Sequence, residues 1–238
     1  MEKNLFKTIT AVVLLVALLS SCSKTVDTKQ VYADSYINAI YNRAGVPVYS
    51  IMHTAYSFSK LSSVSVKGTL SPAQTLTDPT GLGLSFYTTV DTTKYSTVLP
   101  SADTFTYSAL YSSGEAVTMS DAVPSNSLQP VQLLVAAKTP AAAPTDISLT
   151  WNANPNAQAY KVRIFNMDPA APASIIYESD FLTPKDAVTP LSIQYPLNNF
   201  VQYSLVYIRF EVSSFIFQKD QSTFNAVSVA TTKNIVGL

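Results

Sequence analysis

The sequence predicts an all-β protein in which two β-sandwich domains follow one another along the chain. Of its 238 residues, 14 are Tyr and 11 are Phe, and only 13% are charged. Aromatic and β-branched side chains suit the half-buried surface of a pleated sheet, and many short runs alternate apolar with polar residues as strands do. No long stretch is rich in Ala, Leu, Glu and Lys, so we expect helices to be rare.

The chain begins with the features of an export signal. Lys3 and Lys7 precede an apolar run over residues 9–19, and small residues follow that run. As a helix this run would span only about 17 Å, against roughly 30 Å of hydrocarbon in a bilayer, so it is too short for a permanent membrane span. We therefore expect residues 1–21 to be a signal peptide that is removed.

Cys22, the only cysteine, ends the sequence Leu19-Ser20-Ser21-Cys22. These four residues closely resemble the lipobox of bacterial lipoproteins. The resemblance implies that the Cys22 thiol is acylated, with palmitate among the lipids, and that the membrane is a partner through this anchor. It places the protein in the cell envelope, at the outer membrane. The alternative is an ordinary secretory signal with an incidental cysteine.

The first domain is expected over residues 31–138, behind a short polar tether at residues 22–30. Its first segment, residues 32–41, fits either one face of a short helix or an alternating strand, and the sequence leaves this choice open. Later segments alternate more regularly or lie between turn signals. The strands expected from them are residues 47–58, 61–68 and 81–90.

The clearest hairpin of this domain joins residues 104–111 to residues 116–119. The four residues between the two arms include Gly114, as hairpin loops favour. Along the first arm, Phe105, Tyr107 and every second residue after them share one face, as in a strand with one buried side. This domain resembles bacterial immunoglobulin-like domains in the hairpin turn and in the residues that lead into its first arm. That resemblance concerns architecture and carries no functional residue.

Prolines mark the expected boundary between the domains. Four of them lie between residues 123 and 144, and prolines interrupt strand ladders and stiffen linkers. Residues 131–135 form an apolar stretch that can serve as an edge strand. We expect a linker at residues 139–144 and the second domain at residues 145–238.

The second domain resembles fibronectin type III domains. Residues 147–151 alternate and end in Trp151, the turn Asn154-Pro155-Asn156 follows, and alternation resumes at Tyr160. The resemblance implies that Trp151 lies in the core. It also implies that Tyr203, six residues after Leu197, hydrogen-bonds the backbone at a sheet corner.

This resemblance has two departures. Asn199 and Val201 stand where the family usually has proline and threonine around the tyrosine corner. The strand-like stretch over residues 203–217 is unusually long and aligns Arg209 with apolar neighbours. A β-bulge near Arg209 is expected to turn this arginine outward.

The charge of the chain argues against nucleic acid as a partner. Without Lys3, Lys7 and Glu2, the 15 basic and 15 acidic side chains of the whole sequence become 13 and 14. No cluster of Lys and Arg offers a footprint for phosphates. No phosphate-binding glycine motif is present, so the sequence implies no cofactor.

Catalytic motifs are also missing. His53 is the only histidine, Cys22 is committed to the anchor, and no Gly-x-Ser-x-Gly elbow is present, so we interpret His53 as a structural or surface residue. One His and one lipidated Cys cannot supply a zinc site, and no EF-hand loop exists. We expect no catalytic and no metal-binding residues.

Glycoside hydrolysis needs only two carboxylates, so it is a further alternative. Glu178 and Asp180 are expected on one side of a strand and are the only motivated pair. Solvated carboxylates that protect an edge strand from aggregation are the favoured interpretation.

Exposed aromatic rings could stack on sugars. The core is the favoured place for any given tyrosine, since large sandwich cores without disulfides need aromatic side chains. The tyrosines that could instead form a platform are Tyr49, Tyr87, Tyr95, Tyr111, Tyr177 and Tyr207.

These observations predict a membrane-anchored, non-enzymatic binding or assembly module of the cell envelope. A glycan-binding accessory lipoprotein of an outer-membrane uptake system is the alternative, and a carboxylate-dependent hydrolase is less favoured. The sequence identifies neither the protein or glycan partner nor the face of the membrane, since an acidic cluster that marks surface export in some lipoproteins does not follow Cys22.

Overall fold

The computed structural model describes residues 29–89, 91–132, 134–138, 145–219, 223–232 and 235–236, and it confirms the all-β prediction. Its strands are β1 (Val31–Tyr41), β2 (Pro47–Ser57), β3 (Leu61–Gly68), β4 (Gln74–Thr75), β5 (Ser85–Tyr87), β6 (Asp103–Tyr111), β7 (Ala116–Val123), β8 (Val135–Lys138), β9 (Asp146–Trp151), β10 (Ala159–Asn166), β11 (Ser174–Glu178), β12 (Leu191–Pro196), β13 (Ile208–Phe217), β14 (Phe224–Thr232) and β15 (Ile235–Val236). The helices of the described residues are the short 3-10 segments η1 (Thr92–Lys94), η2 (Leu197–Phe200) and η3 (Leu205–Tyr207). Within these residues, no helix has the length and apolar character needed to cross a membrane.

The strands form three sheets, and one of them contains strands from both ends of the chain. Its seven strands are ordered β11-β10-β13-β14-β1-β2-β5, and the two four-stranded sheets are β12-β9-β8-β15 and β4-β3-β6-β7. The junction is a parallel pair between β1 and β14, in which Ile37 lies opposite Ala226 and Ile40 lies opposite Val229. The sequence predicted tandem sandwiches but not this shared sheet. The expected linker at residues 139–144 lies outside the described residues.

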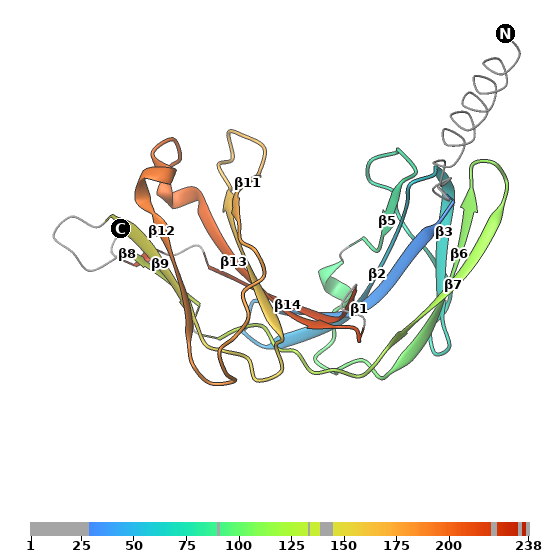
Figure 1. Ribbon diagram of the computed structural model, residues 1–238, viewed down its shortest axis with the longest axis horizontal. Helices are drawn as coiled ribbons and strands as arrows, with labels where there is room; N and C mark the ends of the chain where they lie inside the picture. Colours follow the sequence, from blue (N-terminus) through green and yellow to red (C-terminus); the bar gives the residue numbers. More distant parts are fainter. Residues whose placement is uncertain are drawn as a thin grey trace, which may run out of the picture.

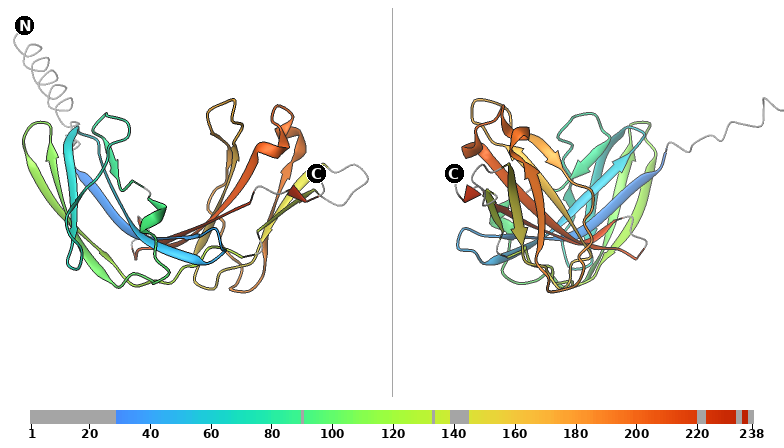
Figure 2. Two further views of the ribbon diagram at one scale, coloured as in Figure 1. Left: turned by 180° about the vertical axis from the view of Figure 1, so that it is seen from behind. Right: turned by 60° about the vertical axis from the view of Figure 1, so that its left-hand side comes forward.

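Both four-stranded sheets pack on the same face of the seven-stranded sheet. On one side, Tyr107 of β6 places its hydroxyl 2.6 Å from the Ser35 hydroxyl of β1. On the other side, the ring of Trp151 in β9 lies 5.8 Å from the ring of Tyr160 in β10. Figures 1 and 2 show the result: the long sheet bends, its two ends rise on the same side of the molecule, and the small sheets flank them on the outside.

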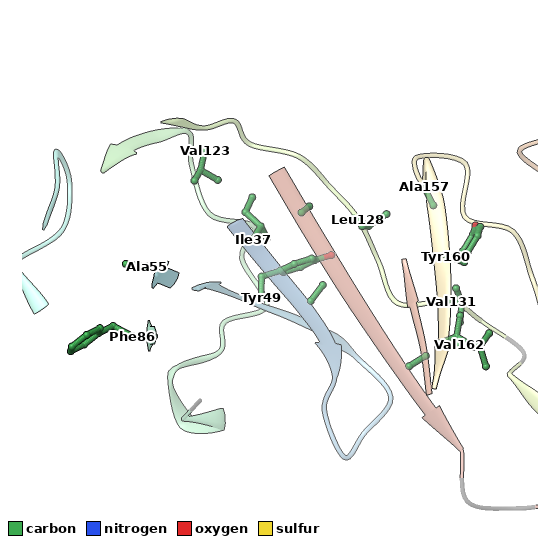
Figure 3. Close-up of a cluster of buried hydrophobic side chains, with 14 of the residues drawn as sticks. Ile37, Tyr49, Ala55, Phe86, Val123, Leu128, Val131, Ala157, Tyr160 and Val162 are labelled. Carbon is green, nitrogen blue, oxygen red and sulfur yellow. The ribbon is translucent and has the colours of Figure 1, made fainter. Parts of the chain in front are cut away.

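The segment between β7 and β8 covers the middle of this face. Its residues Leu128 and Val131 are buried in one hydrophobic cluster with Ile37, Val123 and Val162 (Figure 3). The same cluster includes residues of both small sheets. The Tyr41 hydroxyl donates to the Pro130 carbonyl at 3.0 Å, and the Ser228 hydroxyl donates to the Gln129 carbonyl at 3.0 Å. The core is therefore continuous between the two halves of the molecule.

Most of the N-terminal strands lie where the sequence places them. The open choice for residues 32–41 is resolved as a strand, the hairpin β6–β7 is confirmed, and the strand over residues 61–68 matches β3. Two expectations were inaccurate. Within residues 81–90 only β5 is a strand, and the edge strand expected at residues 131–135 instead begins at Val135, because Val131 is used to fill the core.

The C-terminal half follows the expected family pattern at one position and departs from it at another. Trp151 is fully buried, as predicted. Tyr203, however, lies half-buried on a turn, and the structure gives its hydroxyl no hydrogen bond to a described residue. Tyr160 makes a comparable bond instead, since its hydroxyl accepts a 2.6 Å hydrogen bond from the Asn154 backbone N–H.

The prediction of a β-bulge near Arg209 was also wrong. Strand β13 begins only at Ile208, and its irregularity against β14 lies between Ile216 and Phe217. Arg209 stays in register opposite Phe165 of β10, with its guanidinium 4.6 Å from the centre of that ring. It reaches the face away from the core without a bulge because η3 shifts the alternation of the residues that precede the strand.

Candidate ligand-binding site

His53, the one candidate for acid–base chemistry, is buried in a hydrogen-bonded chain. Its Nδ1 lies 2.9 Å from the Ser35 hydroxyl, which in turn lies 2.6 Å from the Tyr107 hydroxyl. Tyr107 donates its only hydroxyl hydrogen to the Asp34 carbonyl at 2.6 Å. Ser35 must therefore donate to Tyr107 and accept from His53. With this polarity His53 cannot act as a base toward Ser35.

The surroundings of His53 also favour a structural role. Ser35 is fully buried, so its hydroxyl is out of reach of a substrate. The Phe105 ring packs against the imidazole at 4.6 Å, and no described carboxylate hydrogen-bonds the ring. Burial lowers the pKa of His53 from 6.5 to about 4, which keeps the imidazole neutral at neutral pH.

This lowered pKa predicts an acid-sensitive fold. Between pH 6.5 and about 4 the unfolded chain binds a proton at His53 and the folded chain does not, so the free energy of unfolding should fall as the pH falls. The full shift corresponds to a loss of about 3 kcal/mol. Urea denaturation across this window should show the loss in the wild type and a weaker pH dependence in His53→Gln. Parallel losses in the two proteins would rule out His53 as the cause.

The carboxylate pair suggested by the sequence is not assembled as a catalytic site. Glu178 binds Lys161 at 2.5 Å and Arg163 at 2.6 Å, and these hydrogen bonds hold its pKa below the usual value. Asp180 lies beyond the end of β11 and is exposed. The carboxylate linked to Glu178 is Glu211, which lies 3.6 Å from Arg163 and whose pKa is raised by burial.

None of these carboxylates lines the clefts around Pro130, Gly45, Asp34 or Ser101 that described residues form. A glycosidase needs a cleft that holds a sugar between its two carboxyl groups. The arrangement of Lys161, Arg163, Glu178 and Glu211 is that of an ion-pair network on a sheet surface.

The six tyrosines considered for a sugar platform are dispersed. Tyr49 and Tyr111 are buried in the core, and Tyr95 accepts a hydrogen bond from Asn38 at 2.7 Å. Tyr177 packs against Tyr195, with ring centres 4.5 Å apart. The two that are more exposed, Tyr87 on β5 and Tyr207 on η3, lie in different halves of the molecule. These six therefore form no common platform.

A different site forms where the seven-stranded sheet divides. Strand β14 pairs with β1 only from Ile37 onward, so residues 31–36 have β2 on one side and no described strand of the same sheet on the other. A cleft of about 510 Å³ lies there, which we call the β1 cleft. It is lined by Val31, Tyr32, Ala33, Asp34, Thr54, Tyr56, Met119, Ser120, Asp121, Gln218 and Thr223.

Three polar side chains meet in the β1 cleft. The Gln218 amide donates to Asp121 at 3.0 Å and to Asp34 at 3.3 Å. Each carboxylate also replaces a missing strand partner: Asp121 accepts from the Ser35 backbone N–H at 2.6 Å, and Asp34 accepts from the Phe224 N–H at 3.4 Å. These bonds orient the two carboxylates, and each oxygen can accept more than one hydrogen bond.

Two aromatic rings form the other wall of the cleft. Tyr32 of β1 and Tyr56 of β2 stack with ring centres 4.7 Å apart and planes only 11° from parallel. They meet because they lie directly opposite in the β1–β2 register. Tyr56 is 46% exposed, so the stack is accessible from solvent. Neither Tyr32 nor Tyr56 is among the six tyrosines that the sequence suggests for a platform.

Chemically, the cleft combines aromatic faces with oriented hydrogen-bond acceptors. Sugars offer apolar C–H faces and ring hydroxyl donors, and binding sites pair such features with a few fixed polar groups. Among the described residues, no group of three or more His, Cys, Asp or Glu side chains is placed to hold a metal ion. The arrangement can bind a polar ligand, and it contains no nucleophile paired with a base.

No protein-family model matches the chain, and neither does any curated protein. Among solved structures, one of a 1.5-MDa bacterial ice-binding adhesin is 9% identical, with a TM-score of 0.27, over 88% of this chain and 66% of that one. A DUF4785 family protein from Legionella pneumophila is 13% identical, with a TM-score of 0.28, over 86% and 55%. A Ca²⁺-stabilized, ice-binding adhesin of an Antarctic bacterium is 10% identical, with a TM-score of 0.22, over 85% and 49%. The chain thus spans less than two thirds of these proteins, and TM-scores this low support no conclusion about its fold or function.

Proposed function

We propose that this protein is a non-enzymatic binding module of the cell envelope, anchored in the outer membrane by a lipid on Cys22, and that the β1 cleft holds its ligand. The single observation that carries the proposal is the accessible Tyr32–Tyr56 stack beside Asp34, Asp121 and Gln218. The anchor itself rests on the lipobox-like residues that end at Cys22.

The ligand class that fits this cleft best is a glycan. A sugar ring can lay a C–H face on an aromatic ring while its hydroxyls donate to the carboxylates. A volume of about 510 Å³ lies within the range of small-molecule sites, which is roughly 300–1,000 Å³. This chemistry favours the glycan-binding accessory lipoprotein over a purely structural assembly module.

A glycan array probed with the mature protein tests this function. We expect binding to at least one class of glycan, and Tyr32→Ala should weaken it at least tenfold, or about 1.4 kcal/mol, because the stack loses one of its two rings. Tyr207→Ala is a matched control, since Tyr207 is 38% exposed but lies outside the cleft. An array without binding, or equal affinity of the wild type and Tyr32→Ala, would count against a glycan site in the cleft.

A further inference from the structure

One end of the N-terminal half exposes large apolar side chains beside the start of the described chain. This tether tip consists of Lys29 and of residues 58–60, 82–84 and 112–115. It is the upper right end of the molecule in Figure 1, where the β6–β7 turn lies. Phe58 is 71% exposed there and Leu82 is 61% exposed. Single exposed apolar residues are ordinary. These two lie on loops joined by backbone hydrogen bonds at the end where the described chain starts, so they offer apolar contact area there.

Backbone hydrogen bonds hold the parts of the tether tip together. The Leu61 N–H donates to the Gly83 carbonyl at 2.7 Å, and the Ser112 N–H donates to the Lys60 carbonyl at 2.9 Å. Gly83 has a φ of +73°, and a side chain there would meet the Leu61 carbonyl at 2.5 Å. Only glycine fits this position, so Leu82 is presented from a fixed loop.

Phe58 is held in place by two neighbouring aromatic rings. Its ring meets the rings of Tyr32 and Tyr56 edge-on, with both centre-to-centre distances at 6.3 Å. Lys60, two residues later, is exposed at the same turn. Aromatic and aliphatic side chains next to lysine are the composition of surfaces that lie at a membrane interface.

The length of the tether limits which end of the molecule can lie close to the membrane. Lys29 is seven residues after Cys22, which allows a reach of at most about 25 Å. Tyr111 binds the Lys29 carbonyl through its hydroxyl, so the tether starts at the tip itself. The opposite end of β1 is about 36 Å farther along the strand. A lipid on Cys22 therefore keeps the tether tip, and not the other end of the sandwich, close to the bilayer.

We propose that the tether tip docks on the lipid bilayer, with Phe58 and Leu82 in the headgroup–acyl boundary and Lys60 among the phosphates. This inference rests on the lipid anchor proposed for Cys22. The short tether raises the local concentration of the bilayer around the tip, so two apolar side chains suffice for a contact that would be weak in a free protein.

Site-specific fluorescence on the lipidated mature protein in phosphatidylethanolamine–phosphatidylglycerol vesicles tests this orientation. Because Cys22 is the only native cysteine and its thiol is acylated in the anchored protein, an introduced cysteine is the only one that a fluorophore can label. Phe58→Cys and Leu82→Cys place the label at the tip. Val46→Cys is the control, because Val46 is 43% exposed in the turn at the far end of the β1–β2 hairpin.

Labels at positions 58 and 82 should shift to shorter emission wavelengths and lose fluorescence to nitroxide-bearing lipids, while the label at position 46 should remain as in water. Flotation of the vesicles separates the two proposals. If the protein floats but all three labels behave as in water, the docked tip is wrong and the anchor stands. If the protein does not float, the anchor fails and the docked tip fails with it.

Discussion

Replacing Cys22 with serine is expected to move the protein from the membrane fraction of the cell to the soluble fraction and to abolish the incorporation of labelled palmitate. Each buried methylene of an acyl chain contributes about 0.8 kcal/mol to membrane binding, so several chains on one cysteine anchor a protein stably. The signal-peptide segment could not replace this anchor as a membrane-spanning helix, because the apolar run at residues 9–19 is too short to span a bilayer.

The control for this experiment is Thr25→Ser, which changes the same tether and keeps the thiol. Both proteins should fold alike, because Cys22 and Thr25 precede Val31, where the first described strand begins. Membrane association and palmitate labelling should persist in Thr25→Ser. If Cys22→Ser stays in the membrane fraction, the lipoprotein interpretation is wrong.

The second large effect is expected at the parallel junction between the two halves. Ile37 is 1% exposed, lies opposite Ala226 in the register, and belongs to the cluster that includes both small sheets. Ile37→Ala should lower the free energy of unfolding by about 2–5 kcal/mol, the usual cost of truncating a large core side chain to alanine. Both halves should lose stability together because they share one sheet and one core.

Trp151, the only tryptophan, reports on the C-terminal half, whereas Ile37 belongs to the first strand of the chain. Urea unfolding followed by Trp151 fluorescence should therefore shift to lower midpoint in Ile37→Ala. Val46→Ala, in the exposed β1–β2 turn, should leave the midpoint unchanged. An unaltered Trp151 transition in Ile37→Ala would mean that the two halves unfold independently.

Local patterns were sufficient to predict much of the secondary structure. The β6–β7 hairpin followed from alternation on both sides of a glycine-containing turn, and β3 followed from alternation alone. Trp151 was expected in the core and is fully buried. These features depend on residues close together in the sequence, so their signals are complete within a short window.

The candidate site was not predictable in the same way. Tyr32 and Tyr56 become neighbours through the register of the β1–β2 hairpin, and a turn identified at residues 42–46 could have indicated that pairing. Asp121 reaches the Ser35 backbone across 86 residues of sequence, and no local pattern specifies such a contact. For His53, the sequence and the structure point in different directions. As the only histidine it was the one candidate for acid–base chemistry, but its burial beside Ser35 and Phe105 indicates a structural role.

The sequence by itself determined the all-β class, most of the strands and the expectation of an acylated Cys22, because alternation and short motifs act through near neighbours. Tertiary structure alone decided that the halves share a sheet. The β1–β14 pair joins strands almost 190 residues apart, and parallel pairing places no turn signal between them. That same pairing begins only at Ile37 and leaves the β1 cleft open beside residues 31–36, because β14 starts at Phe224, whose backbone N–H donates to the Asp34 carboxylate.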